Sequence, residues 1–158
     1  MIARWLSIML ALLSGPACAA DRGFCQALDT LRKEAARSGP QRVSVIKDEA
    51  MTFACELTKG APAEKAFCDA AADAVGIEFT HKYPWLIFDC LEKSEVTAKL
   101  ELADQYTGIS GRKKIRHLWA RWHDGTRLDI LFRPGGDLGD GLEYKDYWGR
   151  YDMVVWKP

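Results

Sequence analysis

Three histidines, His81, His117 and His123, are the residues of this chain best suited to proton transfer or metal binding. An imidazole changes its charge near neutral pH, so it can act as a general acid, a general base or a metal ligand. A metal site needs several ligands close together. His117 and His123 are six residues apart on one expected strand, which separates them by roughly 20 Å. The two do not share a metal ion, and we predict no cofactor.

Four cysteines follow the first twenty residues: Cys25, Cys55, Cys68 and Cys90. Cys90 could act as a nucleophile with His81, but only as a free thiolate. The chain lacks the C-x-x-C spacing of thiol oxidoreductases. An even number of cysteines in a small exported chain favours two disulfides instead. Sequence alone does not choose among the three pairings, of which we favour Cys25–Cys55 with Cys68–Cys90.

Charged side chains gather at two places. The acidic group recurs every third position after a Gly-Gly pair, which does not match an EF-hand loop, so we favour a solvated loop over a calcium site. The basic group would suit contact with an anionic envelope polymer or a lipid headgroup. The acidic residues are Asp137, Asp140, Glu143 and Asp146, and the basic ones are Arg112, Lys113, Lys114 and Arg116.

Aromatic residues concentrate late in the chain, with thirteen of the sixteen that follow residue 20 lying from position 79 onward. Part of this set must fill a core. A loop that holds Tyr144, Tyr147 and Trp148 beside Arg150 also has the composition of a protein interface, with rigid aromatic area and a guanidinium. These four residues, together with His117, are our candidate binding residues.

Residues 1–20 have the layout of a secretory signal peptide. Arg4 precedes an apolar run from Trp5 to Leu13, and small residues flank the expected cleavage site. The run is shorter than the ~20 residues of a membrane-spanning helix. Lipidation of Cys18 is the less favoured alternative, because no aliphatic residue stands three positions before it.

The remaining residues 21–158 suit a single domain. Removal of the leader takes one of the 22 basic residues and none of the 22 acidic ones, so the charge stays close to neutral. Near-neutrality argues against general nucleic-acid binding, which needs a basic surface. No later segment is apolar enough to cross a membrane. We therefore expect a periplasmic or secreted protein.

The first half of the chain predicts helices over residues 21–38 and 62–75. An apolar stripe at helical spacing and a closing Gly39-Pro40 define the first, and Pro62 and Gly76 bound the second. Residues 42–57 fit both a helical face and an alternating strand, and we favour strand, turn and strand.

The second half predicts a sheet. Residues 85–91 form a continuous apolar run that we interpret as a central strand, residues 96–102 alternate as a one-sided strand, and residues 151–156 form the last strand.

Asp124-Gly125 predicts a two-residue type I′ turn between two strands. The expected cross-strand pairs are Arg121 with Leu128, Trp119 with Ile130, and His117 with Phe132. The inward face would then carry Ile115, His117, Trp119, Leu128, Ile130 and Phe132. On the outer face, Trp122 would lie opposite Arg127 as a cation–π pair.

The predicted fold is α+β, with N-terminal helices packed on a mostly antiparallel sheet that is formed mainly by the C-terminal half. No motif in the chain names a reaction. We therefore favour a non-enzymatic binding or inhibitor-type protein with an envelope or secreted protein as its partner. One alternative is a small hydrolase of envelope polymers that uses His81, His117 or the acidic loop. Another is a carrier of a small apolar ligand, with Trp85 and Trp119 lining the cavity.

Overall fold

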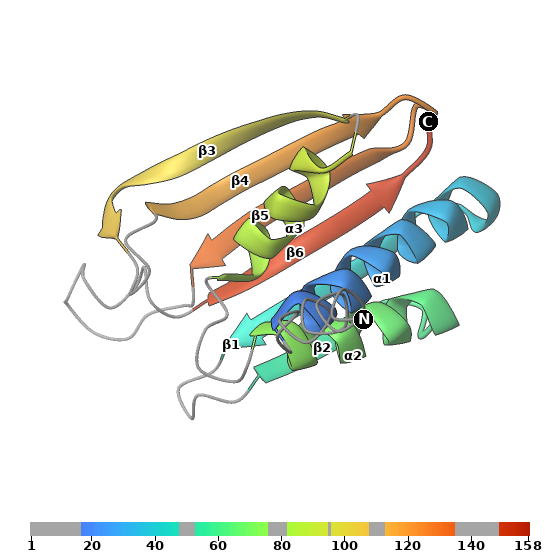
Figure 1. Ribbon diagram of the computed structural model, residues 1–158, viewed down its shortest axis with the longest axis horizontal. Coiled ribbons are helices and arrows are strands. Elements are labelled where there is room, and N and C mark those ends of the chain that lie inside the picture. The colour runs from blue at the N-terminus through green and yellow to red at the C-terminus, as the bar shows by residue number, and fades with distance from the viewer. Residues whose placement is uncertain (1–16, 48–52, 76–81, 95, 108–112, 135–148) are drawn as a thin grey trace, which may run out of the picture.

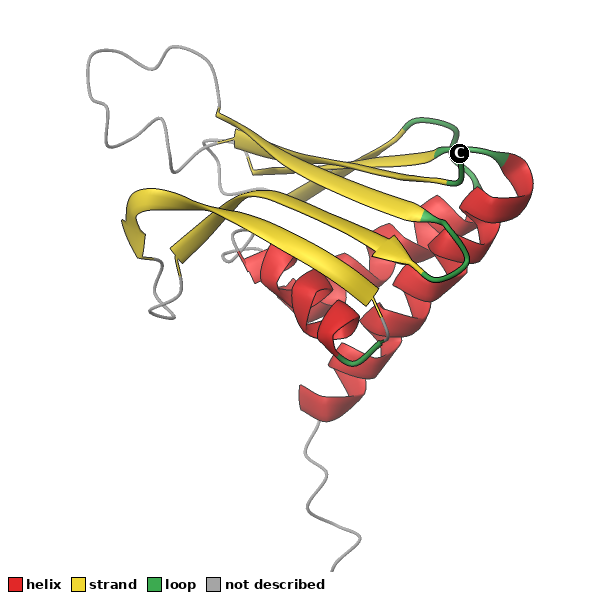
Figure 2. Ribbon diagram, turned by 90° about the horizontal axis from the view of Figure 1, so that it is seen from above, coloured by secondary structure: helices red, strands yellow, loops and turns green. Residues whose placement is uncertain are grey.

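The computed structural model describes residues 17–47, 53–75, 82–94, 96–107, 113–134 and 149–158. Within these ranges, three helices cover one face of a six-stranded antiparallel sheet (Figures 1 and 2). The elements are α1 (Ala17–Ser38), β1 (Gln41–Lys47), β2 (Phe53–Leu57), α2 (Pro62–Val75), α3 (Tyr83–Glu92), β3 (Val96–Thr107), β4 (Lys113–Trp122), β5 (Arg127–Pro134) and β6 (Gly149–Trp156). The strand order is β2-β1-β6-β5-β4-β3, and every neighbouring pair is antiparallel. The predicted α+β class is confirmed.

Most of the expected elements are present. The helix predicted over residues 21–38 is α1, which begins four residues earlier, inside the segment assigned to the leader. The second predicted helix is α2, and the two strands that we favoured within residues 42–57 are β1 and β2, while the expected turn lies outside the described residues. Residues 96–102 lie in β3 and residues 151–156 lie in β6.

Residues 85–91 do not form the expected central strand, because they lie in helix α3. Pro84 occupies the first turn of this helix, where its missing N–H costs nothing. Tyr83, Ile87, Cys90 and Leu91 are buried at spacings of four, three and four residues, which is a helical stripe. A short apolar run does not distinguish a buried strand from a buried helix, and here the helix packs over β4.

The expected disulfide pairing is also wrong. Cys25 pairs with Cys90 and joins α1 to α3, while Cys55 pairs with Cys68 and joins β2 to α2. The Cα atoms of the two pairs are 5.4 and 5.8 Å apart, which is within the usual range for a disulfide. The helical state of residues 83–92 decides this pairing, because it sets Cys90 beside α1. Both disulfides tie the helical layer together or to the sheet edge.

The turn between β4 and β5 has three residues, His123, Asp124 and Gly125, and not the expected two. The N–H of Trp122 donates to the C=O of Thr126 at 3.0 Å, and the N–H of Gly125 donates to the C=O of Trp122 at 3.0 Å. Gly125 has φ +85°, a conformation that glycine adopts without steric cost. This is the three-residue hairpin loop with a bulge at its last position.

The additional turn residue slips the register of β4 by one position relative to our prediction. Leu118 pairs with Ile130 and Ala120 pairs with Leu128, and all four are buried. Since the side chains of a strand alternate between faces, His117 and Trp119 lie on the face opposite to the predicted one.

The cation expected opposite Trp122 is also different. Arg32 of α1, and not Arg127, lies over the Trp122 ring, with its guanidinium carbon 5.8 Å from the ring centroid.

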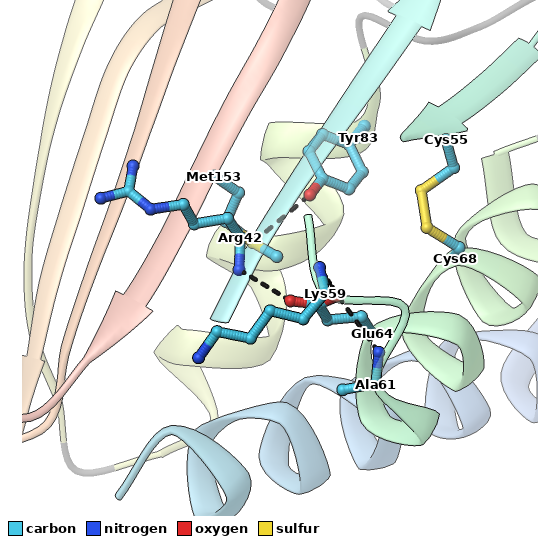
Figure 3. Close-up of a disulfide and its surroundings, with 8 residues drawn as sticks. All are labelled: Arg42, Cys55, Lys59, Ala61, Glu64, Cys68, Tyr83 and Met153. Carbon is cyan, nitrogen blue, oxygen red and sulfur yellow. Dashed lines mark hydrogen bonds between the residues drawn. A yellow bond between two sulfur atoms is a disulfide. The ribbon is translucent and has the colours of Figure 1, made fainter. Parts of the chain in front are cut away.

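Aromatic side chains fill the space between helices and sheet. Phe24 of α1, Phe67 of α2 and Tyr83 of α3 contact one another with ring centroids 5.3 to 6.3 Å apart, and Tyr151 of β6 lies 6.1 Å from Tyr83. The Tyr83 hydroxyl donates to the Met153 sulfur at 3.3 Å (Figure 3). All three helices therefore meet the sheet at one aromatic cluster.

Glu64, at the third position of α2, fixes that helix to the sheet (Figure 3). Its side chain is fully buried, and its two oxygens accept the backbone N–H groups of Arg42, Lys59 and Ala61 at 3.2, 3.0 and 3.4 Å. The Ala61 contact is half of a capping box, and the negative charge suits a helix N-terminus. The Arg42 contact reaches β1, so one carboxylate connects helix, turn and strand beside the Cys55–Cys68 disulfide.

Gly149 is the position where a side chain would disturb the sheet most directly. A Cβ there would lie 2.7 Å from Phe132 Cζ and would also overlap the Arg133 carbonyl oxygen. Gly149→Ala is expected to lower the free energy of unfolding by about 1–3 kcal/mol, as overpacking does. Urea unfolding measures this effect. The control is Gly23→Ala in α1, where a Cβ meets nothing within 4 Å and which is expected to be neutral or stabilising by up to about 1 kcal/mol. Equal effects at the two glycines would contradict the expectation.

Tyr83 is expected to make the fold sensitive to alkali. Burial raises the pKa of its hydroxyl well above the usual value near 10. The unfolded chain therefore loses this proton first, and stability that is fully present below pH ~10 falls as the pH rises further. Unfolding followed between pH 8 and pH 11 should show a shallower alkaline loss in Tyr83→Phe than in the parent. Identical alkaline slopes would show that Tyr83 does not stay protonated.

Candidate functional site

The side of the sheet away from the helices forms the candidate site, which we call the open face (Figure 2). Its side chains alternate along each strand with those of the buried core. Hydrophobic residues occur among the charges: Leu131 is 41% exposed, and Trp119, Val154 and Trp156 are half-buried. The other described members are Arg42, Ser44, Glu56, Thr97, Lys99, Glu101, His117, Arg121, Arg127, Asp129, Arg133, Arg150 and Asp152.

Side chains of β3, β4 and β5 interact on the half of the open face that ends at the edge strand β3. His117 Nε2 lies 3.0 Å from Asp129 Oδ1, and the Lys99 ammonium lies 5.1 Å from the centroid of the Trp119 ring. The Asp129 carboxylate is therefore engaged by an imidazole, and one face of the Trp119 indole is covered by a cation.

Asp152 of β6 organises a second part of the open face. Its carboxylate accepts the Ser44 hydroxyl at 2.6 Å and meets the guanidinium groups of Arg133 and Arg150. The Nε atom of Arg150 is 3.2 Å from Asp152 Oδ1. These two arginines thus already have an anionic partner on the protein.

Arg121 and Arg127 lie directly opposite each other on β4 and β5, and both are exposed. Trp156 is the next residue of this row, opposite Arg127 on β6. Neither arginine forms an ion pair within the part of the chain that the structure describes. Like charges in directly opposed positions destabilise a sheet, so this pair is not explained by the stability of the fold.

The arginine pair borders a depression of about 340 Å³. Its walls include both guanidinium residues, the two indoles of Trp119 and Trp156, and Asp129. The two flat indoles thus flank two guanidinium groups. A guanidinium presents parallel N–H donors that match the two oxygens of a carboxylate.

A second depression, of about 330 Å³, lies between α1 and α3 beside the Cys25–Cys90 disulfide. Leu86 and the charged residues Asp89, Glu92 and Lys93 line it together with Phe24 and the two cysteines. Its described lining includes no histidine, and its two cysteines form the disulfide.

The sequence-based candidates are only partly placed by the structure. Tyr144, Tyr147 and Trp148 lie outside the described residues. His117 and Arg150 both lie on the open face, on β4 and β6. His117 pairs with Leu131 of β5, whereas Arg150 lies in a neighbouring row, opposite Arg133. His117 does not belong to the predicted inward set, because of the register slip described above.

Five open-face residues are not among the predicted binding residues: Trp119, Arg121, Arg127, Leu131 and Trp156. The predicted two-residue turn places Trp119 in the core and pairs Arg127 with Trp122. Counting the turn as three residues would have placed Trp119 and Arg121 on the outer face. The predicted inward set Leu128, Ile130 and Phe132 implies that Leu131 lies on the outer face, although leucine usually indicates burial.

Other proposed chemistries have less support among the described residues. Cys90 forms a disulfide and is not a thiolate, while His81 and the acidic group at residues 137–146 are not described. No three His, Cys, Asp or Glu side chains gather as a metal site in the described ranges. Trp119 lies on the open face and Trp85 on α3, on opposite sides of the sheet, so they do not line one cavity.

The predicted basic cluster is also divided. Lys114 is buried, with its ammonium 3.3 Å from the centroid of the Phe132 ring, whereas Arg116 is exposed. Arg112 and the side chain of Lys113 lie outside what the structure describes. Lys114 therefore does not belong to a displayed basic patch.

No family model matches this chain, and neither the curated proteins nor the solved structures give a match. Separately, none of the described helices is long and apolar enough to cross a membrane.

Replacing one member of the arginine pair is expected to stabilise the protein. Arg121→Gln removes a like charge directly opposite Arg127 and should raise the free energy of unfolding by about 0.2–1 kcal/mol at low salt. The gain should shrink as added salt screens the repulsion. Urea unfolding at two salt concentrations measures both effects. Arg133→Gln is the control, since it removes a contact with Asp152 and should not stabilise. A lower stability of Arg121→Gln at low salt would show that Arg121 is compensated in solution.

Proposed function

We propose that this chain is an exported, non-enzymatic binding protein of the inhibitor type, periplasmic or secreted, whose open face receives a protein partner. The leader-like residues 1–20 support export. The two disulfides support an oxidising compartment, where such bonds persist.

The observation that carries the proposal is the composition of the open face on a rigid sheet. Tryptophan and arginine are the residues most enriched among those that dominate binding energy, and this face displays both beside the exposed Leu131. A sheet held by hydrogen bonds on both sides of β5 and β6 loses little conformational freedom on binding.

The size of the open face also suits a protein partner. Six strands about 4.8 Å apart span roughly 24 Å, and eight residues along a strand span roughly 26 Å. The face is therefore on the order of 600 Å², close to the ~800 Å² that each partner contributes to a standard interface.

Binding is favoured over hydrolysis because of what surrounds His117. Its described partner is Asp129, which would orient an imidazole acting as a base. Within the described residues, however, no serine, threonine or cysteine hydrogen-bonds to His117, so this pair has no nucleophile to activate.

The proposal is tested with a partner that has been captured by the exported protein and then purified. Trp119→Ala combined with Leu131→Asp should weaken its binding by at least about 30-fold, the effect of losing a hot spot. Lys65→Asp, on the exposed side of α2, is the control and should leave binding unchanged. Isothermal titration calorimetry measures the dissociation constants. Binding of the Trp119/Leu131 double variant within twofold of the parent would exclude the open face.

A second double variant distinguishes binding through the open face from binding through the aromatic residues Tyr144, Tyr147 and Trp148. Tyr147→Ala with Trp148→Ala removes two candidate residues that the structure does not describe. If this variant alone loses the partner, the loop carries the binding and the open-face assignment fails.

A further inference from the structure

We infer that Arg121 and Arg127, flanked by Trp119 and Trp156, form a carboxylate-binding site whose occupant is an acidic polypeptide segment of the partner. This inference rests on the proposed function and assigns the chemistry that the open face recognises.

The arginine pair differs from the other arginines named here in having no anionic partner among the described residues. Arg133 and Arg150 share Asp152, and Arg32 of α1 contacts Asp29 and Asp124. Arg121 and Arg127 have no such partner among the described residues, although they repel each other across the strands.

The nearest carboxylate in the register does not serve them. Asp129, two residues along β5 from Arg127, lies opposite Trp119 and is hydrogen-bonded to His117. Among the described residues, no carboxylate is therefore left to neutralise the arginine pair.

The shape of the site also suits a carboxylate. The row Arg121, Arg127, Trp156 crosses three adjacent strands, and Trp119 lies in the next row beside the same depression. Each guanidinium offers parallel donors to a carboxylate, and the indoles offer apolar walls on either side.

The apolar side chains beside the arginines favour a polypeptide as the occupant. A ligand that offers only phosphate would engage the two arginines and leave Trp119, Trp156 and the exposed Leu131 in water. A polypeptide segment with alternating acidic and apolar side chains covers both kinds of group. The near-neutral chain also concentrates uncompensated positive charge here, which complements an acidic segment.

The experiment uses the exported protein, labelled with ¹⁵N, and a synthetic peptide of alternating glutamate and leucine. Its matched partner has glutamine in place of every glutamate. The indole N–H signals of Trp119 and Trp156 report on binding. The glutamate peptide should bind at least about tenfold more tightly than the glutamine peptide, the difference expected for hydrogen bonds to charged groups. Its affinity should also fall with added salt.

Variants of the arginines give the second readout. Arg121→Gln with Arg127→Gln should weaken the glutamate peptide at least about tenfold while the melting temperature stays at or above that of the parent. Arg37→Gln, on an exposed position of α1, is the control and should change nothing. Equal binding of the two peptides, or unchanged binding by the double variant, would overturn the inference.

Two further ligands distinguish the source of the anion. Inorganic phosphate and phosphatidylglycerol vesicles should not shift the two indole signals at concentrations where the glutamate peptide saturates. A shift by either one would overturn the assignment to a polypeptide.

The purified partner separates this inference from the proposed function. If the Trp119/Leu131 variant loses the partner but the Arg121/Arg127 variant retains it, the proposed function stands and the carboxylate site is wrong. If both variants bind the partner like the parent, the proposed function itself has failed.

Discussion

The turn at His123, Asp124 and Gly125 fixes which residues of β4 enter the core. Gly125 closes the turn at φ +85°, and Asp124 accepts the Thr126 N–H at 2.9 Å and pairs with Arg32 of α1. Burial of Asp124 raises the pKa of its carboxyl, but the hydrogen bond from Thr126 and the charge of Arg32 outweigh this and leave the pKa lowered. The turn is thus held both by its own hydrogen bonds and by the helical layer. A register shifted by one residue would place Arg121 in the core and Leu118 in water.

The helical layer is attached to one side of the sheet by several unrelated contacts. Glu64 connects α2 to β1, the aromatic cluster around Tyr83 joins the three helices to β6, and Cys25–Cys90 ties α3 to α1. Because all these contacts are on one side, the opposite face of β4, β5 and β6 is left for other interactions (Figure 2). A central strand paired on both edges gives such a face a fixed geometry, which is what a specific interface requires.

The open face combines satisfied and unsatisfied charge. Asp152 is engaged by two guanidinium groups and Asp129 by an imidazole, whereas the opposed Arg121 and Arg127 have no anionic partner among the described residues. A protein selected for stability alone would relieve such a repulsion, since one substitution suffices. Local rules that a sequence breaks without compensation often mark functional positions. The uncompensated arginine pair is therefore the part of the open face to which we assign the recognition of the proposed partner.

The sequence by itself determined the fold class, the helices α1 and α2, and the strands β3 and β6, because local periodicity and glycine or proline boundaries are short-range properties. For residues 42–57 it favoured the strands β1 and β2 without excluding a helix. It did not determine the helix at residues 83–92, whose apolar run suits either a strand or a helix until its burial against β4 is known. The disulfide pairing followed from that helix, and the composition of the open face followed from one residue in a turn. Contacts between distant segments decided all three, since only they establish which of two locally acceptable states buries the apolar side chains and leaves Trp119, Arg121 and Arg127 on the open face.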